Sequence, residues 1–179
     1  MSELGRLLTA MVTPYTADGA VDYAHARRLA ASLVRAGNHG VVVTGTTGEA
    51  PLLTDDEKVH LWEEIKQELG PAGTVIAGAG TNDTRHSVVL CRRAEQAGVD
   101  GILAVAPYYL RPPQTGIIEH FRRLAESTSL PVIIYNVPSR VGTNMTVDTL
   151  LQLAQVPNIV GDKEANGDLH AVAQVMEAA

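Results

Sequence analysis

The chain has 179 residues, of which 45% are hydrophobic, 19% charged and 4% aromatic, and its formal net charge is −6. This length and composition predict one globular domain and exclude a disordered or collagen-like chain. Adjacent arginines occur only on helix-like segments, where neighbouring side chains point about 100° apart, so we do not expect a nucleic-acid interface. No apolar run approaches the roughly 20 residues that cross a bilayer, and no membrane association is expected.

Cysteine usage bears on the compartment. The sequence contains one cysteine, Cys91, which cannot form a disulfide within the chain. The start of the chain lacks the basic residues, apolar run and small-residue cleavage site of a secretory signal. These features predict a reducing, cytoplasmic location.

Short apolar or β-branched runs alternate with longer amphipathic segments along the whole chain. In chain order, the predicted strands are 7–12, 40–44, 74–77, 101–105, 132–135 and 158–161. The segments between them predict helices over 22–35, 55–69, 84–97, 115–127, 147–154 and from about 167 onward. The chain is therefore a series of βα units.

Helix-capping residues support these boundaries. Thr54 is followed three residues later by Glu57, which is the pattern of a capping box. Asp22 and Thr146 stand at the predicted N-cap positions of two other helices. Glycines at the positions expected after helix ends are Gly37, Gly70 and Gly98.

Nearly continuous apolar strands joined by helices predict a parallel sheet covered by helices, either doubly wound or closed into a TIM (β/α)8 barrel. A barrel usually needs about 250 residues. The pattern supplies six of the eight units, so the interpretation as a barrel implies one domain over residues 1–179 that is incomplete at its C-terminal end.

Polar residues gather directly after the predicted strands, where parallel α/β folds bind their ligands. These segments are 44–49, 78–83, 107–109, 135–140 and 163–164. The glycines and hydroxyls of the Gly45-Thr46-Thr47-Gly48 turn suit a carboxylate or phosphate oxygen, although an ordinary βα turn explains the motif equally well.

Two further functions have weaker support. The Gly78-Ala79-Gly80 sequence resembles the start of a dinucleotide-binding motif, but Asp83 stands where the third glycine belongs, which favours a structural turn. The six histidines never occur at metal-ligand spacing. We therefore predict no catalytic metal.

Lys163 is the most informative single residue. A lysine at the carboxyl end of a strand projects into the mouth of a barrel, where desolvation lowers its pKa and leaves a neutral, nucleophilic amine. Tyr135 lies at the equivalent height one strand earlier, and Tyr109 and Thr46 follow earlier strands. Such hydroxyls can relay the protons that imine and aldol chemistry requires. Taken singly, a surface lysine and core tyrosines with satisfied hydroxyls are the commoner explanations.

Four ordered motifs together resemble the dihydrodipicolinate synthase (4-hydroxy-tetrahydrodipicolinate synthase) family. They are Gly-Thr-Thr-Gly-Glu at 45–49, Pro-Tyr-Tyr at 107–109, Tyr-Asn-Val-Pro-Ser-Arg at 135–140 and Lys-Glu-Ala at 163–165. The resemblance runs from about Leu7 to the last residue. It implies a class I aldolase-type lyase on a TIM barrel, which condenses pyruvate with L-aspartate 4-semialdehyde in lysine (diaminopimelate) biosynthesis.

The resemblance also implies a role for each matching residue. Lys163 would form the Schiff base with pyruvate, and Tyr135 would pass protons to and from the imine. Thr46 and Tyr109 would complete the proton relay. No metal and no separate cofactor would be needed, and the chain would form a homotetramer built from dimers, with Tyr109 reaching into the neighbouring subunit's pocket.

Substrate binding separates this family from its relatives by mechanism. Thr47 would hold the pyruvate carboxylate and Arg140 the carboxylate of the semialdehyde, since the guanidinium fork takes a carboxylate bidentately. The alternatives are N-acetylneuraminate lyase, a keto-deoxy sugar acid aldolase, or an inactive βα module, which the missing units favour.

Asp162 replaces the family's usual aliphatic residue, and an unpaired buried carboxylate there would cost several kcal/mol or take up a proton.

Overall fold

A computed structural model describes residues 4–178, so residues 1–3 and 179 of the predicted domain lie outside the described part. The chain forms two compact units. The first unit contains the residues up to Gly78 together with Arg93–Ile102, and the second contains Ala79–Arg92 and the residues from Leu103 onward. One barrel domain over residues 1–179 stays a prediction.

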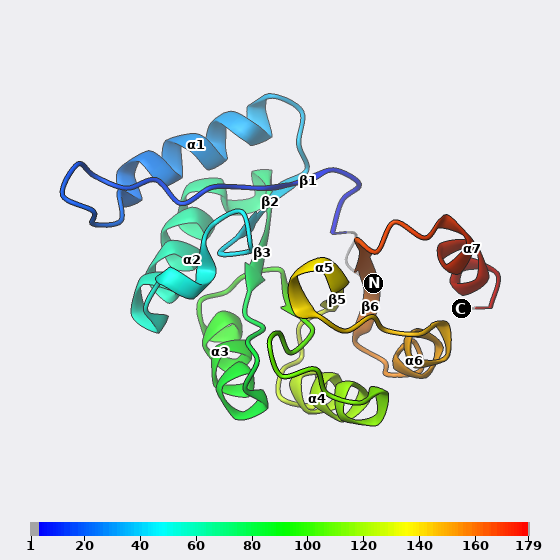
Figure 1. The fold of residues 1–179 in the computed structure, drawn as a ribbon. Coiled ribbons are helices and arrows are strands. Elements are labelled where there is room, and N and C mark those ends of the chain that lie inside the picture. Colours follow the sequence, from blue (N-terminus) through cyan, green and yellow to red (C-terminus); the bar gives the residue numbers. More distant parts are fainter. Residues whose placement is uncertain (1–3, 179) are drawn as a thin grey trace. The chain divides into compact units, whose positions relative to one another are not determined.

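The first unit consists of parallel strands with helices between them. Its strands are β1 (Leu8–Ala10), β2 (Gly40–Val43) and β3 (Thr74–Gly78), and its helices are α1 (Tyr23–Arg35) and α2 (Asp55–Leu69), with 3-10 turns η1 (Ala50–Leu52) and η2 (Gly70–Ala72). β2 pairs in parallel with both β1 and β3. α1 packs against β2 and α2, and α2 packs against β3 (Figure 1).

Two elements are divided between the units. Helix α3 (Thr84–Gln96) begins in the second unit and ends in the first, and strand β4 (Gly101–Val105) begins in the first and ends in the second. The start of β4 is tied to β3 within the first unit, because the Asp100 N–H donates to the Val75 carbonyl at 2.9 Å. The Asp100 carboxylate also accepts from the Val75 N–H at 2.8 Å.

The second unit continues the βα pattern. Its remaining elements are α4 (Gln114–Glu126), β5 (Val132–Asn136), α5 (Pro138–Val141), α6 (Val147–Leu153), β6 (Ile159–Glu164) and α7 (Leu169–Ala178). β5 and β6 are parallel, with a register shift between Val132 and Ile133. α6 packs against both α4 and α7 (Figure 1).

The helix caps form as the sequence predicts. The Thr54 hydroxyl accepts from the Glu57 N–H at 3.3 Å, and the Glu57 carboxylate accepts from the Thr54 N–H at 2.8 Å, which completes the capping box of α2. Asp22 caps α1 by accepting from the His25 N–H at 2.8 Å. Each cap satisfies a backbone donor that the first turn leaves unpaired.

Each unit contributes fully buried apolar side chains. In the first unit the largest fully buried side chains are Val41, Leu61, Trp62, Ile65, Ile76 and Ile102. Ile102 lies in the part of β4 that belongs to this unit. In the second unit they are Leu90, Ile117, Phe121, Leu124, Met145 and Leu153. Among the described residues, no helix has both the length and the apolarity needed to cross a membrane.

The element boundaries differ from the prediction in two informative places. β6 continues to Glu164 instead of ending at Gly161, so Lys163 lies within the strand. A short helix, α5, follows β5 in a segment for which we predicted neither a helix nor a strand. Pro138 occupies its first turn, where a fixed φ and a missing N–H favour helix initiation, and its four residues are too few to produce a periodic pattern.

Candidate active site

Lys163 and Tyr135 lie together on two neighbouring strands of the second unit. They are register partners in the parallel pair β5–β6, so their side chains emerge on the same face. The Lys163 Nζ atom lies 4.2 Å from the centroid of the Tyr135 ring. Tyr135 is buried and Lys163 is partly buried. The structure therefore brings together two of the six site residues that the sequence predicts.

The surroundings of Lys163 act on its charge in opposite directions. The face of the Tyr135 ring attracts an ammonium group and so favours the protonated lysine. Desolvation by burial disfavours the charged form. Desolvation by burial lowers the pKa of Lys163 from its usual value. A larger fraction of the amine is consequently unprotonated, and available as a nucleophile, than for a lysine in water.

The chain has only three lysines, which are Lys58, Lys66 and Lys163. Lys58 and Lys66 each form an ion pair with a carboxylate. Lys58 Nζ lies 3.6 Å from an Asp55 carboxylate oxygen. Lys66 Nζ donates to both carboxylate oxygens of Asp100, at 2.6 and 2.7 Å. Among residues 4–178, no ion pair involves Lys163. Lys163 is thus the lysine whose amine is not held in its charged form by a carboxylate.

A polar cluster occupies the opposite face of the same strand ends. Asn136 is completely buried, and its Nδ2 donates to Asn144 Oδ1 and to Glu164 Oε2, each at 2.8 Å. Asn136 Oδ1 accepts from the Met145 N–H at 3.2 Å. The other Glu164 oxygen accepts from the Asn166 N–H at 2.8 Å. These bonds connect β5, β6 and the segment before α6, on the face of the two strands that is opposite Tyr135 and Lys163.

Asp162 lies on the same face as this cluster. It is the register partner of Ile134 and precedes Lys163, so strand alternation turns it away from the amine. Burial, the Glu164 charge and a hydrogen bond with Glu164 raise the pKa of Asp162 to about 7, although the Asn136 backbone N–H opposes them. Its Oδ1 atom has no partner among the described residues. This shift is in the direction that the sequence predicts for a buried carboxyl at this position.

We expect Asp162→Asn to stabilise the protein more at pH 8 than at pH 5. The pKa of Asp162 is about 7 in the folded state and close to its usual value in the unfolded chain. Between about pH 4 and 7 the folded state keeps a proton that the unfolded state loses, so stability falls as the pH rises through this window. Asparagine removes this dependence.

After a discount for the partial exposure of the carboxyl, the difference in stabilisation between the two pH values should be about 1–2 kcal/mol. Urea unfolding at each pH measures it. Glu177→Gln, which alters an exposed carboxylate on α7, is the control and should change stability little at either pH. An equal effect of Asp162→Asn at both pH values would contradict the shifted titration.

Thr46 and Thr47 lie in the first unit, on the loop that follows β2. Both side chains are exposed. The loop is a tight turn, in which the Glu49 N–H donates to the Thr46 carbonyl at 3.1 Å and the Ala50 N–H to the Gly45 carbonyl at 3.3 Å. Because both residues are exposed, their hydroxyls can donate a hydrogen bond to a ligand oxygen.

Tyr109 and Arg140 are exposed residues of the second unit. Tyr109 is 87% exposed and has a left-handed backbone, with φ of 72°. Arg140 lies on α5, directly after the end of β5. Within the described part of the chain, no hydrogen bond or ring contact joins either side chain to Lys163 or Tyr135. Their predicted roles in catalysis and substrate binding stay predictions.

The sequence does not reveal the residues that hold the site in place. Asn136 stands inside the Tyr-Asn-Val-Pro motif, yet its partner Glu164 lies 28 positions away. The sequence offered one signal of such a residue, an asparagine between two apolar residues at the end of a strand. A buried amide there needs hydrogen-bond partners. The partners themselves depend on the parallel register of β5 and β6.

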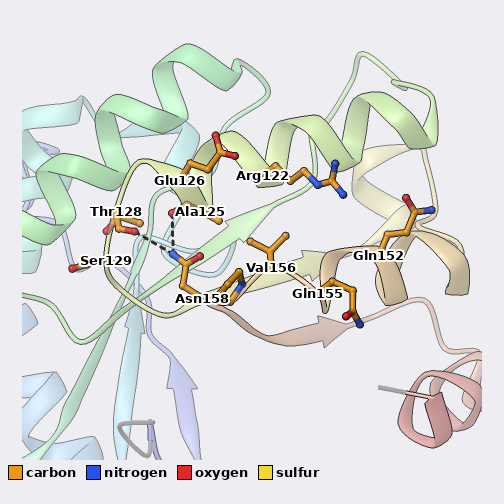
Figure 2. Close-up of a pocket in the computed structure, with 10 residues that line it drawn as sticks. Arg122, Ala125, Glu126, Thr128, Ser129, Gln152, Gln155, Val156 and Asn158 are labelled. Atoms are coloured by element: carbon orange, nitrogen blue, oxygen red, sulfur yellow. Dashed lines mark hydrogen bonds between the residues drawn. The ribbon is translucent and has the colours of Figure 1, made fainter.

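A pocket of about 530 Å³ in the second unit lies elsewhere (Figure 2). It is formed by the end of α4 and the segment before β6, where the Asn158 side-chain amide donates to the carbonyls of Ala125 at 2.9 Å and Thr128 at 3.1 Å. Asn158 immediately precedes β6, whereas Lys163 is near the other end of that strand. None of the six predicted site residues lines this pocket.

The candidate site carries no cluster of metal-ligating side chains. Over residues 4–178, no group of three or more His, Cys, Asp or Glu residues is arranged to hold a metal ion. The groups that the second unit brings together are the Lys163 amine and the Tyr135 phenol.

Repeated βα units with polar side chains at the carboxyl ends of parallel strands define an α/β protein of the doubly wound or TIM (β/α)8-barrel class. A sequence model of the Dihydrodipicolinate synthetase family matches residues 3–179. The chain belongs to this family.

Individual relatives agree with this assignment. The chain is 53% identical to the 4-hydroxy-tetrahydrodipicolinate synthase of Moorella thermoacetica, over 98% of this chain and 60% of the relative. It is 52% identical to the enzyme of the same name from Acidothermus cellulolyticus, over 96% of this chain and 56% of the relative. The chain thus spans about 60% of the length of the curated relatives that it matches.

Solved structures confirm the fold class predicted from the sequence. A dihydrodipicolinate synthase from Bacillus anthracis matches with a TM-score of 0.98 and 42% identity, over 100% of this chain and 61% of that one. The Acinetobacter baumannii dihydrodipicolinate synthase, solved in complex with pyruvate, matches with a TM-score of 0.95 and 38% identity over 98% of this chain and 60% of that one. The fold is that of the TIM-barrel family, with about six βα units in this chain.

Proposed function

We propose that this protein catalyses the 4-hydroxy-tetrahydrodipicolinate synthase reaction, the condensation of pyruvate with L-aspartate 4-semialdehyde in lysine (diaminopimelate) biosynthesis. Membership of the family supports the reaction, and two relatives that are 53% and 52% identical carry this name. The observation that carries the proposal is the Lys163 amine, which lies 4.2 Å from the Tyr135 ring centroid and has a lowered pKa.

The proposed chemistry begins with the neutral amine of Lys163. It attacks the ketone carbon of pyruvate, and loss of water leaves a protonated imine. The positive imine draws electrons from its carbon, so the former pyruvate methyl group loses a proton and becomes the nucleophilic end of an enamine. This carbon then attacks the aldehyde carbon of the semialdehyde. Tyr135, whose ring centroid lies 4.2 Å from the Lys163 amine, passes the protons.

Other residues take the roles that the family implies. Thr46 and Tyr109 complete the proton relay, Thr47 holds the pyruvate carboxylate, and Arg140 holds the carboxylate of the semialdehyde. A covalent Schiff base on the protein supplies the electron sink, so the proposed reaction uses no metal and no separate cofactor.

The proposal extends to assembly and location. A cytoplasmic homotetramer built from dimers, with Tyr109 reaching into a neighbouring subunit, is typical of the family that the motifs resemble. The 87% exposure of Tyr109 supports this arrangement, because it leaves most of a large aromatic surface uncovered. Small-molecule substrates are the only other partners proposed.

Reductive trapping tests the Schiff base. The protein is incubated with pyruvate and borohydride, which delivers a hydride to the imine carbon and leaves a stable secondary amine. We expect a pyruvate-derived mass increase on the peptide that contains Lys163. Absence of the adduct in a folded sample would contradict the proposal and favour an inert βα module.

Turnover assays separate the synthase from its mechanistic relatives. The same preparation is supplied with pyruvate and aspartate semialdehyde, with sialic acid, or with a keto-deoxy sugar acid. We expect product only from the semialdehyde, because Arg140 offers a bidentate partner to its carboxylate. Turnover of a sugar acid alone would assign the protein to the lyases.

A further inference from the structure

The loop that carries Thr46 and Thr47 begins at a strained residue. Thr44, the first residue after β2, has a φ of 56°, in the left-handed region. A β-branched residue rarely adopts this conformation, because its side chain crowds the backbone. Such strain persists only where the surrounding structure enforces it, and it concentrates at functional sites.

A buried tryptophan holds Thr44 in this conformation. The Trp62 Nε1–H on α2 donates to the Thr44 hydroxyl at 2.8 Å, and that hydroxyl donates to the Val43 carbonyl at 2.7 Å. Trp62 is completely buried, and Thr44 is nearly so. Because Trp62 is in the middle of a well-packed helix, the bond fixes the start of the loop to a rigid element.

The backbone beside Thr44 is equally confined. Gly78, at the end of β3, lies so close that a Cβ atom on it would come within 2.2 Å of the Thr44 carbonyl oxygen. Glycine at position 78 therefore allows β3 to approach the strained residue. Thr44 is held from one side by the indole and from the other by the neighbouring strand.

The far end of the loop is also anchored. The Thr13 hydroxyl donates to the Gly48 carbonyl at 2.7 Å, and Glu49 is again left-handed, with φ of 55°. Thr46 and Thr47 are the exposed residues between these two anchors. The hydroxyls of the loop are thus presented by a backbone that is fixed at both ends.

We propose that Thr44 and Trp62 are positioning residues for the carboxylate-binding loop of the candidate active site. This inference rests on the proposed function, in which Thr47 receives the carboxylate of pyruvate. The indole donor keeps Thr44 in its strained conformation and so fixes the Thr46 and Thr47 donors before the ligand arrives. Fixing them in advance lowers the entropy lost on binding.

Three variants separate positioning from simple stability. Trp62→Phe keeps an aromatic ring but removes the donor, whereas Thr44→Ser keeps the hydroxyl. Thr44→Gly removes the hydroxyl and also relieves the strain, because glycine adopts a positive φ readily. Leu69→Ala, at the far end of α2, is the control that lowers stability without touching the loop.

Two measurements are made on each variant: hydrogen exchange of the amides of residues 45–49, and the pyruvate concentration that gives half-maximal borohydride trapping. For Trp62→Phe and Thr44→Gly we expect loop exchange to accelerate and half-saturation to rise by about tenfold, the loss of roughly one hydrogen bond to the loop. Thr44→Ser and Leu69→Ala should leave half-saturation within about twofold of the parent protein.

The outcomes distinguish the two proposals. An adduct on Lys163 with unchanged half-saturation in both Trp62→Phe and Thr44→Gly would overturn the inference and leave the proposed function intact. The pyruvate concentration for half-maximal trapping could instead rise only in proportion to the loss of stability, in these two variants and in Leu69→Ala alike. The role of Thr44 and Trp62 would then be structural, and the inference would fail. Absence of any adduct in the folded parent protein would refute the proposed function, and the role given to the loop with it.

Discussion

Replacing Lys163 with arginine should abolish the trapped pyruvate adduct, with a fall of roughly a thousandfold or more in the trapping rate. The guanidinium keeps the positive charge beside the Tyr135 ring but stays protonated at any pH at which the protein is folded, so it cannot attack a carbonyl carbon. The measurement is the mass of the intact protein after incubation with pyruvate and borohydride.

The chain offers a matched control for this experiment. Lys66→Arg makes the same chemical change at a lysine that is paired with Asp100, and arginine can retain this ion pair. We expect the control to form the adduct at the parental rate. An adduct that survives Lys163→Arg and disappears in Lys66→Arg would move the reactive amine to the other lysine and refute the site.

Asn136→Ala should lower the free energy of unfolding by about 3–5 kcal/mol. The amide makes three hydrogen bonds inside the second unit, to Asn144, Glu164 and the Met145 N–H. Alanine leaves the buried Met145 N–H without its acceptor and the partly buried oxygens of Glu164 and Asn144 without their donor, and an unsatisfied buried group costs more than the bond itself contributes. Urea unfolding measures the loss.

The same substitution should slow pyruvate trapping, because Asn136 connects the strand ends that carry Tyr135 and Lys163. Asn144→Ala is the matched control: the side chain belongs to an exposed residue and shares only one of these bonds, so we expect a loss of about 1 kcal/mol. Equal unfolding midpoints for the two variants would show that the cluster around Asn136 contributes little.

The parts of the fold that depend on local signals could be predicted from the sequence. The capping box at Thr54 and the N-cap at Asp22 involve residues three positions apart, and both form. The last strand is different. Gly161 and the polar residues after it suggest a strand end, yet β6 continues to Glu164 because its backbone pairs with β5. Pairing between strands overrides the local composition there.

The candidate site likewise has features that could be predicted from the sequence and features that could not. Alternation along strands and the shared direction of parallel neighbours were enough to place Lys163 beside Tyr135. The hydrogen bond between Trp62 and Thr44 could not be predicted, since it joins a helix to a strand end across 18 positions. The left-handed backbone of Thr44 was equally hidden, because sequence propensity assigns a β-branched residue to extended structure.

The position of the sole tryptophan gives a direct test of cooperativity between the two compact units. Trp62 lies in the first unit, so its fluorescence during denaturation follows the loss of packing around that unit alone, whereas circular dichroism follows helices of both. Coincident transitions would show that the units unfold as one cooperative body. An earlier or later fluorescence transition would reveal a partly folded intermediate in which one unit persists without the other.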